Sequence, residues 1–157
     1  MSIRVTPDML ALAVVAGALV LEWLLPISVL PPAGLTSAVT WIGAAVAVAG
    51  FALEAAAGAA LGRAGTDTRP YGTPTALVET GPFRWSRNPL YLGMLILVTG
   101  LAVAAGVEWG VLLLPLLWLG LDRMVIPAEE RSLREAYPRE WQAYAARVPR
   151  WIGMRAQ

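Results

Sequence analysis

Four long apolar stretches limit what this chain can fold into. They cover residues 9–25, 40–61, 90–107 and 109–126, and none of them carries more than two charged side chains. At a rise of about 1.5 Å per residue, a helix of about 20 residues spans the hydrocarbon core of a bilayer. A soluble fold of 157 residues has no core able to bury four such helices. The stretches therefore predict an all-α, multi-pass transmembrane helical bundle of about four spans.

We expect a single membrane domain over residues 1–157, since this length corresponds to one domain. Its parts are predicted as spans at about 9–28, 39–61, 89–107 and 109–126, a cytosolic loop at 62–88 and a C-terminal cytosolic helical cap at 127–157. The first apolar stretch has no small-residue cleavage site after its core, which favours an anchor over a removed signal peptide.

The C-terminal cap has a helical pattern of its own. Four of its apolar side chains recur at intervals of four, four and three residues: Leu133, Tyr137, Trp141 and Tyr144. Such spacing is typical of one helix face. Pro138 is expected to begin a second short helix, because proline is favoured in a first turn. Trp151 and Ile152 are expected to dock on the membrane interface or on the spans.

The arginines predict the orientation. All twelve basic residues are arginines, with four in the loop at 62–88 and six after residue 127. Because cytoplasmic segments carry the excess of basic residues, both termini and the active site are predicted on the cytoplasmic side of the cell (inner) membrane. The net charge of +1 offers no electrostatic footprint for nucleic acid.

The chain contains no histidine and no cysteine, which excludes much chemistry. Disulfides, thiolate nucleophiles and iron–sulfur ligands need cysteine, while a zinc site of the usual kind or a Ser-His dyad needs histidine. No metal site is predicted. Any chemistry must use Arg, Asp, Glu, Asn, Tyr, Trp and backbone groups.

Residues 81–93 read GPFRWSRNPLYLG. A structural interpretation makes Asn88 the N-cap and Pro89 the first residue of a helix, with the arginines as interface anchors. That interpretation does not require Tyr91 or Gly93 one turn into the span, so a functional role stays open.

Three further features each allow a structural and a functional interpretation. Glu129 and Glu130 follow Pro127, where acids favour a helix start, but two adjacent carboxylates also suit ribose hydroxyls or an ammonium group. In the run RVPRW at 147–151, Arg147 or Arg150 is either a membrane-surface anchor or a bidentate clamp for a carboxylate.

The third feature lies within the second span. Gly50, Glu54, Gly58 and Gly62 repeat every four residues, hence on one helix face. Small residues at this spacing allow close helix approach. Glu54 is either a buried structural residue or a functional one, since an ionisable side chain inside a span is a functional candidate.

In combination these motifs resemble the isoprenylcysteine carboxyl methyltransferase and phospholipid methyltransferase superfamily. The similar segments run from about residue 51 to 152: LGR at 61–63, GPFR at 81–84, RNPLYLG at 87–93, EE at 129–130 and RVPRW at 147–151. Asn88 stands where the isoprenylcysteine branch usually has histidine, and an Asn-Pro-x-Tyr version is more typical of phospholipid N-methyltransferases. The RVPRW ending is more similar to the isoprenylcysteine branch.

The resemblance implies an integral-membrane enzyme that uses S-adenosyl-L-methionine and methylates a lipid-like or amphiphilic acceptor entering from the bilayer. By position, the cofactor-binding residues would be Arg87, Asn88, Pro89, Tyr91, Gly93, Glu129 and Glu130. The catalytic candidates are Arg147 and Arg150, near methyl transfer or the cofactor carboxylate, and Glu54 as a possible base for an amine acceptor. We expect a water-poor cavity, sized for a nucleoside sulfonium, beneath the C-terminal segment.

Two alternatives remain from other functional classes. One is a non-catalytic membrane bundle that retains this scaffold. The other is an enzyme similar to sterol reductases, which share a related Arg-His-Pro-x-Tyr segment but bind NADPH; such enzymes are generally much longer than this chain.

Overall fold

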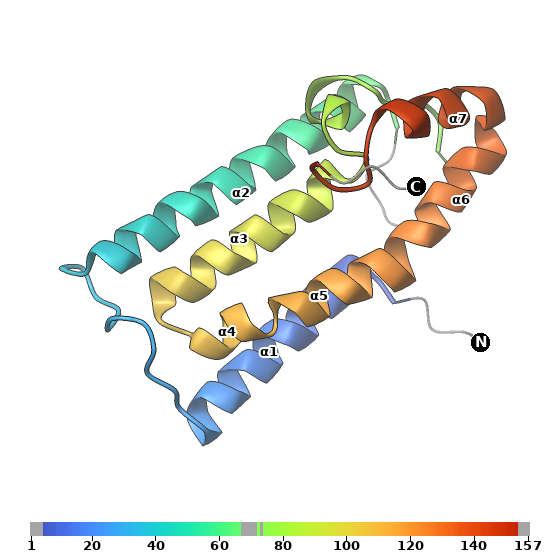
Figure 1. Cartoon of the computed structure of the whole chain (residues 1–157). Helices are drawn as coiled ribbons and strands as arrows, with labels where there is room; N and C mark the ends of the chain where they lie inside the picture. The colour runs from blue at the N-terminus through green and yellow to red at the C-terminus, as the bar shows by residue number, and fades with distance from the viewer. Residues whose placement is uncertain (1–4, 67–71, 73, 154–157) are drawn as a thin grey trace.

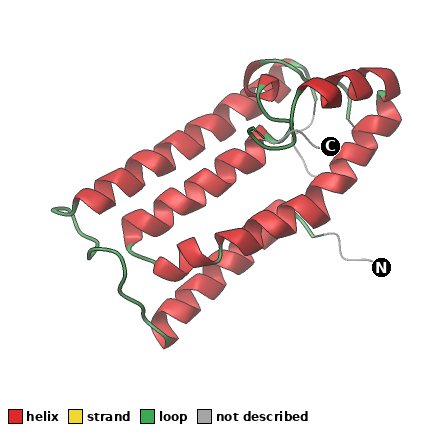
Figure 2. Ribbon diagram, viewed as in Figure 1, coloured by secondary structure: helices red, strands yellow, loops and turns green. Residues whose placement is uncertain are grey.

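A computed structural model describes residues 5–66, 72 and 74–153. Within these ranges every regular element is helical, which confirms the predicted all-α fold (Figures 1 and 2). The elements are α1 (Pro7–Leu24), α2 (Ala38–Arg63), η1 (Gly81–Arg84), α3 (Pro89–Ala105), α4 (Glu108–Leu112), α5 (Leu114–Gly120), η2 (Leu121–Val125), α6 (Ile126–Ala136) and α7 (Pro138–Arg147).

Three helical rods of the described chain are long and apolar enough to cross a membrane: α1, α2 and the run Glu108–Ala136, which joins α4 to α6. The apolar helix α3 is shorter, at 17 residues. About four spans, as predicted, therefore agree with the structure. We call the run Glu108–Ala136 the fourth rod, because it follows α1, α2 and α3 in the chain. It reaches Ala136 and so extends beyond residue 126, where the sequence predicted the span to end.

The closest helix packing joins α2 to α3, which lie side by side in Figure 1. The contact is made by glycines: Gly43 and Gly50 face the backbone of α3, while Gly93 and Gly100 face the backbone of α2. Each glycine lets the opposing backbone approach more closely than a side chain permits.

The sequence predicted that Gly50, Glu54, Gly58 and Gly62 share the contact face of the second span, and the structure places two of these four residues in the contact. Gly50 is in the contact, and a Cβ on Gly93 would lie 2.6 Å from Cγ of Glu54. Gly58 and Gly62, by contrast, have nothing within 4 Å of an added Cβ. The contact follows the seven-residue spacing of Gly43 and Gly50, which returns to the same helix face after two turns.

The second packing centre joins α1, α3 and the fourth rod. Its buried members are Tyr91, Leu117, Leu121, Val125, Ile126 and Trp151, and side chains of α1 pack against them. The predicted docking of Trp151 on the spans is confirmed, since its ring is buried and lies 6.4 Å from the Trp118 ring, centroid to centroid. Ile152, for which the same was expected, is 62% exposed and does not belong to this cluster. The C-terminal segment is thereby fixed to the bundle.

Pro138 begins α7, as predicted. The helix α6 begins at Ile126, beside Pro127 as predicted, but it continues without a break from α5 through η2, a π-helical turn. The N–H of Ile126 donates to the carbonyl of Leu121 and closes this wide turn. Glu129 and Glu130 are consequently interior helix residues, and helix-start electrostatics do not explain them.

We predict that Gly100→Ala destabilises the bundle, because its new Cβ would meet the backbone of Ala47 in α2. Overpacking of this kind costs about 1–3 kcal/mol. Gly58→Ala is the matched control, since it replaces a helical glycine in open space and should leave stability equal or slightly higher. Thermal unfolding midpoints in detergent test this, and equal midpoints for the two variants would contradict it.

Candidate active site

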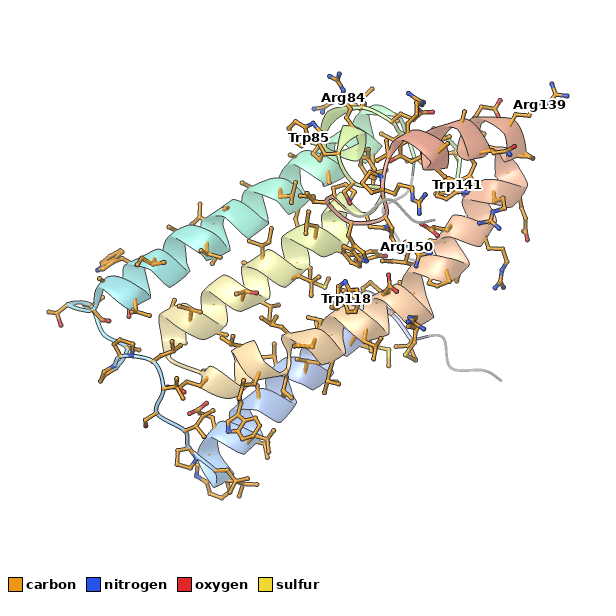
Figure 3. All side chains as sticks on the ribbon, viewed as in Figure 1. Arg84, Trp85, Trp118, Arg139, Trp141 and Arg150 are labelled. Carbon is orange, nitrogen blue, oxygen red and sulfur yellow. The ribbon has the colours of Figure 1, made fainter. Side chains whose placement is uncertain are left out.

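A partly enclosed cavity of about 140 Å³ lies where the ends of α2 and α6 meet η1, the start of α3, and α7. It is lined by Leu61, Gly72, Pro74, Phe83, Arg87, Asn88, Pro89, Leu90, Tyr91, Glu129, Glu130, Ser132, Leu133 and Trp141. In Figure 3, Trp141 and Arg150 lie at this end of the bundle. Of the residues predicted from the sequence, the structure brings together Arg87, Asn88, Pro89, Tyr91, Glu129 and Glu130.

The cavity is smaller than the nucleoside-sized space that the sequence led us to expect. Small-molecule sites usually measure about 300–1,000 Å³. Since one water needs about 10–15 Å³ of such space, this cavity has room for about ten heavy atoms. That is enough for the amino-acid portion of S-adenosylmethionine, and a bound nucleoside would need further space.

Arg87 is the central cation of the cavity. Its side chain is 7% exposed, and its Nη2 lies 3.1 Å from Oε1 of Glu130. Its Nη1 donates to the carbonyl of Ala145 at 3.2 Å, and the guanidinium lies 5.5 Å from the centre of the Trp141 ring. Within the described chain, the buried Nε has no hydrogen-bond partner. An unpaired buried donor costs about 1–3 kcal/mol, so this atom favours an added acceptor.

Glu130 is shared between two guanidinium groups. Besides Arg87, it accepts two hydrogen bonds from Arg150, from Nε at 3.2 Å and from Nη2 at 2.5 Å. These hydrogen bonds raise the pKa of Arg150 above its usual value, so it stays protonated. Arg150 does not line the cavity; it contacts the far side of Glu130.

Glu129 has a different environment from Glu130. The hydroxyl of Tyr91 donates to its Oε1 at 2.6 Å. No arginine of the described segments forms an ion pair with Glu129. The adjacent carboxylates therefore differ: Glu130 is neutralised by two arginines, and Glu129 is available to a cationic group.

Asn88 occupies the N-cap position that the sequence predicts, but its side chain does not cap α3. Its Nδ2 donates instead to the carbonyl of Arg150 at 3.3 Å. The hydroxyl of Ser86 donates to the same carbonyl at 2.9 Å, and the N–H of Arg87 donates to the carbonyl of Pro149 at 2.9 Å. The segment before α3 is thus fastened to the C-terminal segment.

Four of the predicted site residues lie outside the cavity, and one of them, Arg150, contacts Glu130 as described above. Gly93 and Glu54 belong to the contact between α3 and α2. Arg147 is 64% exposed at its side chain and pairs with Glu79 at 2.7 Å, joining α7 to the loop before η1. The roles predicted for these residues stay predictions.

Sequence reasoning missed several functional contacts. Asp122 binds Arg150, and the signal that would have found it is a carboxylate inside a span. Tyr144 is buried, and its hydroxyl donates to the carbonyl of Phe83 at 2.8 Å, which holds α7 on η1. Burial raises the pKa of Tyr144 far above its usual value, so the hydroxyl remains a donor.

We predict that Glu130→Gln destabilises the ligand-free chain far more than Glu129→Gln. The first change leaves two cations, Arg87 and Arg150, without their shared carboxylate, and breaking a buried ion pair costs about 3–5 kcal/mol. The second removes a charge that no arginine of the described segments pairs with, and the amide oxygen of glutamine can still accept from the Tyr91 hydroxyl. Thermal unfolding of the two variants in detergent checks this, and equal midpoints would show that the paired charges do not support the fold.

The sequence profile of the phospholipid methyltransferase family matches residues 38–140, which is 103 of the 157 residues. The match extends from α2 into α7 and includes the cavity arginine Arg87 and the glutamates Glu129 and Glu130. No curated protein and no solved structure matches the chain. The match over most of the chain shows that this protein belongs to the phospholipid methyltransferase family.

Proposed function

We propose that this chain is a membrane methyltransferase that uses S-adenosyl-L-methionine and transfers a methyl group to a lipid-like or amphiphilic acceptor. Family membership supports a membrane methyltransferase. The observation that carries the cofactor assignment is that one cavity holds an unsatisfied guanidinium nitrogen, Nε of Arg87, and a carboxylate that pairs with no arginine of the described segments, Glu129.

These two groups fit the amino-acid portion of the cofactor, which carries a carboxylate and an ammonium group. Arg87 offers a donor to the carboxylate, and the start of α3, whose first turn receives no hydrogen bond from the Asn88 side chain, also favours an anion. Glu129 offers an acceptor to the ammonium group. Glu130 holds Arg87 in place.

S-adenosylmethionine, when bound, supplies an electrophilic methyl group on a sulfonium. The chain's contribution is orientation and exclusion of water, and proximity alone is worth about 7–11 kcal/mol in well-aligned reactions. The apolar lining of Leu61, Phe83, Leu90 and Leu133 keeps the cavity poor in water. The Trp141 ring also lines it, and aromatic faces attract cations by about 0.5–2 kcal/mol.

The acceptor determines whether a base is needed. A carboxylate acceptor needs none, whereas an amine must lose a proton. Asn88 does not titrate, and its amide is already bonded to the carbonyl of Arg150. Glu130 is paired with Arg87 and Arg150, and Glu129 is assigned above to the cofactor's ammonium group, so we assign an amine's proton to water. Glu54 and Arg147 have no contact with the cavity and receive no role in this proposal.

The orientation that we propose places the cavity at the cytoplasmic side. The described arginines that are exposed at this end include Arg63, Arg84, Arg131, Arg134, Arg139 and Arg147. Figure 3 shows Arg84 and Arg139 at the same end of the bundle as the cavity residue Trp141. Basic residues concentrate on the cytoplasmic side of membrane proteins.

Calorimetry with S-adenosylhomocysteine tests the cofactor site. The wild-type chain is expected to bind, and Arg87→Lys is expected to bind at least tenfold more weakly, because lysine keeps the charge opposite Glu130 but lacks the guanidinium fork. Arg84→Gln is the matched control, three residues away and exposed, and should bind like wild type. No binding by wild type, or equal binding by Arg87→Lys, would overturn the proposal.

The acceptor is tested with isotopically labelled cofactor and a total lipid extract. Mass spectrometry is expected to find lipid-like products heavier by one labelled methyl group. Glu129→Gln should reduce their formation at least tenfold for any acceptor, because the cofactor's ammonium group loses its carboxylate. Unlabelled lipids after incubation with a chain that binds S-adenosylhomocysteine would instead indicate a bundle without transferase activity.

A further inference from the structure

Asp122 is a charged side chain inside the fourth rod that has no place in the cavity. It lies on the π-helical turn η2 and its side chain is 13% exposed. A carboxylate in a span is costly unless paired, and π turns occur often at functional sites. These two features call for a role that the cavity lining alone does not supply.

The contacts of Asp122 point to the C-terminal segment. Its Oδ1 accepts hydrogen bonds from two successive residues, Nη1 of Arg150 at 3.2 Å and Nε1 of Trp151 at 2.9 Å. Its Oδ2 lies 3.4 Å from Nε of Arg123, whose side chain is 73% exposed. One carboxylate oxygen therefore fixes both the guanidinium and the indole that follows it.

Through Arg150, Asp122 reaches the cavity. Arg150 uses Nη1 for Asp122 and its other two nitrogens, Nε and Nη2, for Glu130. Glu130 in turn pairs with Arg87, the cation of the proposed cofactor site. Negative and positive side chains thus alternate from Asp122 through Arg150 and Glu130 to Arg87, and the two carboxylates balance the two guanidinium groups.

Loss of the negative charge at position 122 would disturb this balance. Arg87 and Arg150 would then share the single carboxylate of Glu130. Arg150 would also lose the contact that opposes its attraction to Glu130. Arg150 would then be free to shift relative to Glu130. The orientation of Glu130 would be less fixed, and so would that of Arg87, which pairs with it.

We propose that Asp122 is a positioning residue for methyl transfer: it fixes Arg150, and through Arg150 and Glu130 it orients Arg87 toward the cofactor. This inference rests on the proposed function. The positioning role also explains the π-helical turn η2, because Asp122 lies on this turn and its carboxylate contacts Arg150 and Trp151.

The test compares Asp122→Asn with wild type by calorimetry with S-adenosylhomocysteine. Asparagine keeps an oxygen for the Trp151 indole but removes the charge opposite Arg150. We expect about tenfold weaker binding, together with faster amide hydrogen exchange at residues 148–151 in the ligand-free chain. Arg123→Gln is the matched control from the same turn, and both readouts should match wild type, because Arg123 is exposed and contacts Asp122 from outside.

A double-mutant cycle separates positioning from a general structural effect. In an Arg150→Gln background, Asp122→Asn should weaken binding by less than twofold, because its effect passes through Arg150. Asp122→Glu keeps the charge and should bind within about threefold of wild type, which keeps the test valid if the asparagine variant fails to fold.

The outcomes distinguish the two proposals. Equal binding by wild type and Asp122→Asn overturns the positioning role while the proposed function stands. The positioning role is also overturned if Asp122→Glu abolishes binding of S-adenosylhomocysteine. It is overturned as well if Asp122→Asn weakens binding as strongly in the Arg150→Gln background as in the wild-type chain. Absence of binding by wild type overturns the proposed function and this inference with it.

Discussion

The ion pairs around Glu130 are the interaction on which the site depends. Three segments meet there that are far apart in sequence: the start of α3 with Arg87, α6 with Glu130, and the C-terminal segment with Arg150. A buried charge without a partner costs several kcal/mol, so none of the three side chains is stable in place without the others. The docked C-terminal segment thus fixes Glu130 and, through it, Arg87 in the cavity wall. Hydrogen bonds from the backbone N–H of Arg87, the hydroxyl of Ser86 and the side-chain amide of Asn88 to the carbonyls of residues 149 and 150 reinforce that docking.

The membrane part of the fold has a different basis. Close backbone approach at Gly43, Gly50, Gly93 and Gly100 joins α2 to α3, and it involves no charge. The apolar cluster around Leu117 and Leu121 joins α3 to the fourth rod. Because hydrocarbon surrounds these helices, close packing of complementary surfaces holds them together. The ion pairs around Glu130 lie at one end of this packed bundle and form the site there.

Much of this was predictable from the sequence because hydropathy and motif order are local properties. The four apolar stretches gave the helices, and the runs around Arg87 and Glu129 gave the cavity residues. The contacts were not predictable, since they depend on how distant segments meet. The structural interpretation made Asn88 the cap of α3, but its side chain does not cap that helix, and its Nδ2 instead donates to the carbonyl of Arg150 on the docked C-terminal segment. Pro127 was expected to mark a helix start, but the π turn before it lets the rod continue. Arg147 and Arg150 are three residues apart in one motif, yet one pairs with Glu79 at the surface and the other with Glu130.

The charge pattern of the cavity also separates the proposed cofactor from the nicotinamide alternative. A dinucleotide presents several phosphate charges, which proteins bind with unpaired arginines or several helix N-termini. Here Arg87 and Arg150 are already committed to carboxylates, and Glu129 adds a further acidic group to the cavity. The phosphates of a dinucleotide would be repelled by Glu129, and among the described residues the unsatisfied Nε of Arg87 is the buried donor left to attract them. A zwitterion, with a carboxylate for Arg87 and an ammonium group for Glu129, satisfies both sides of the cavity at once. The two adjacent glutamates therefore differ: ion pairs with two arginines neutralise Glu130, whereas Glu129 accepts a hydrogen bond from Tyr91 and pairs with no arginine of the described segments.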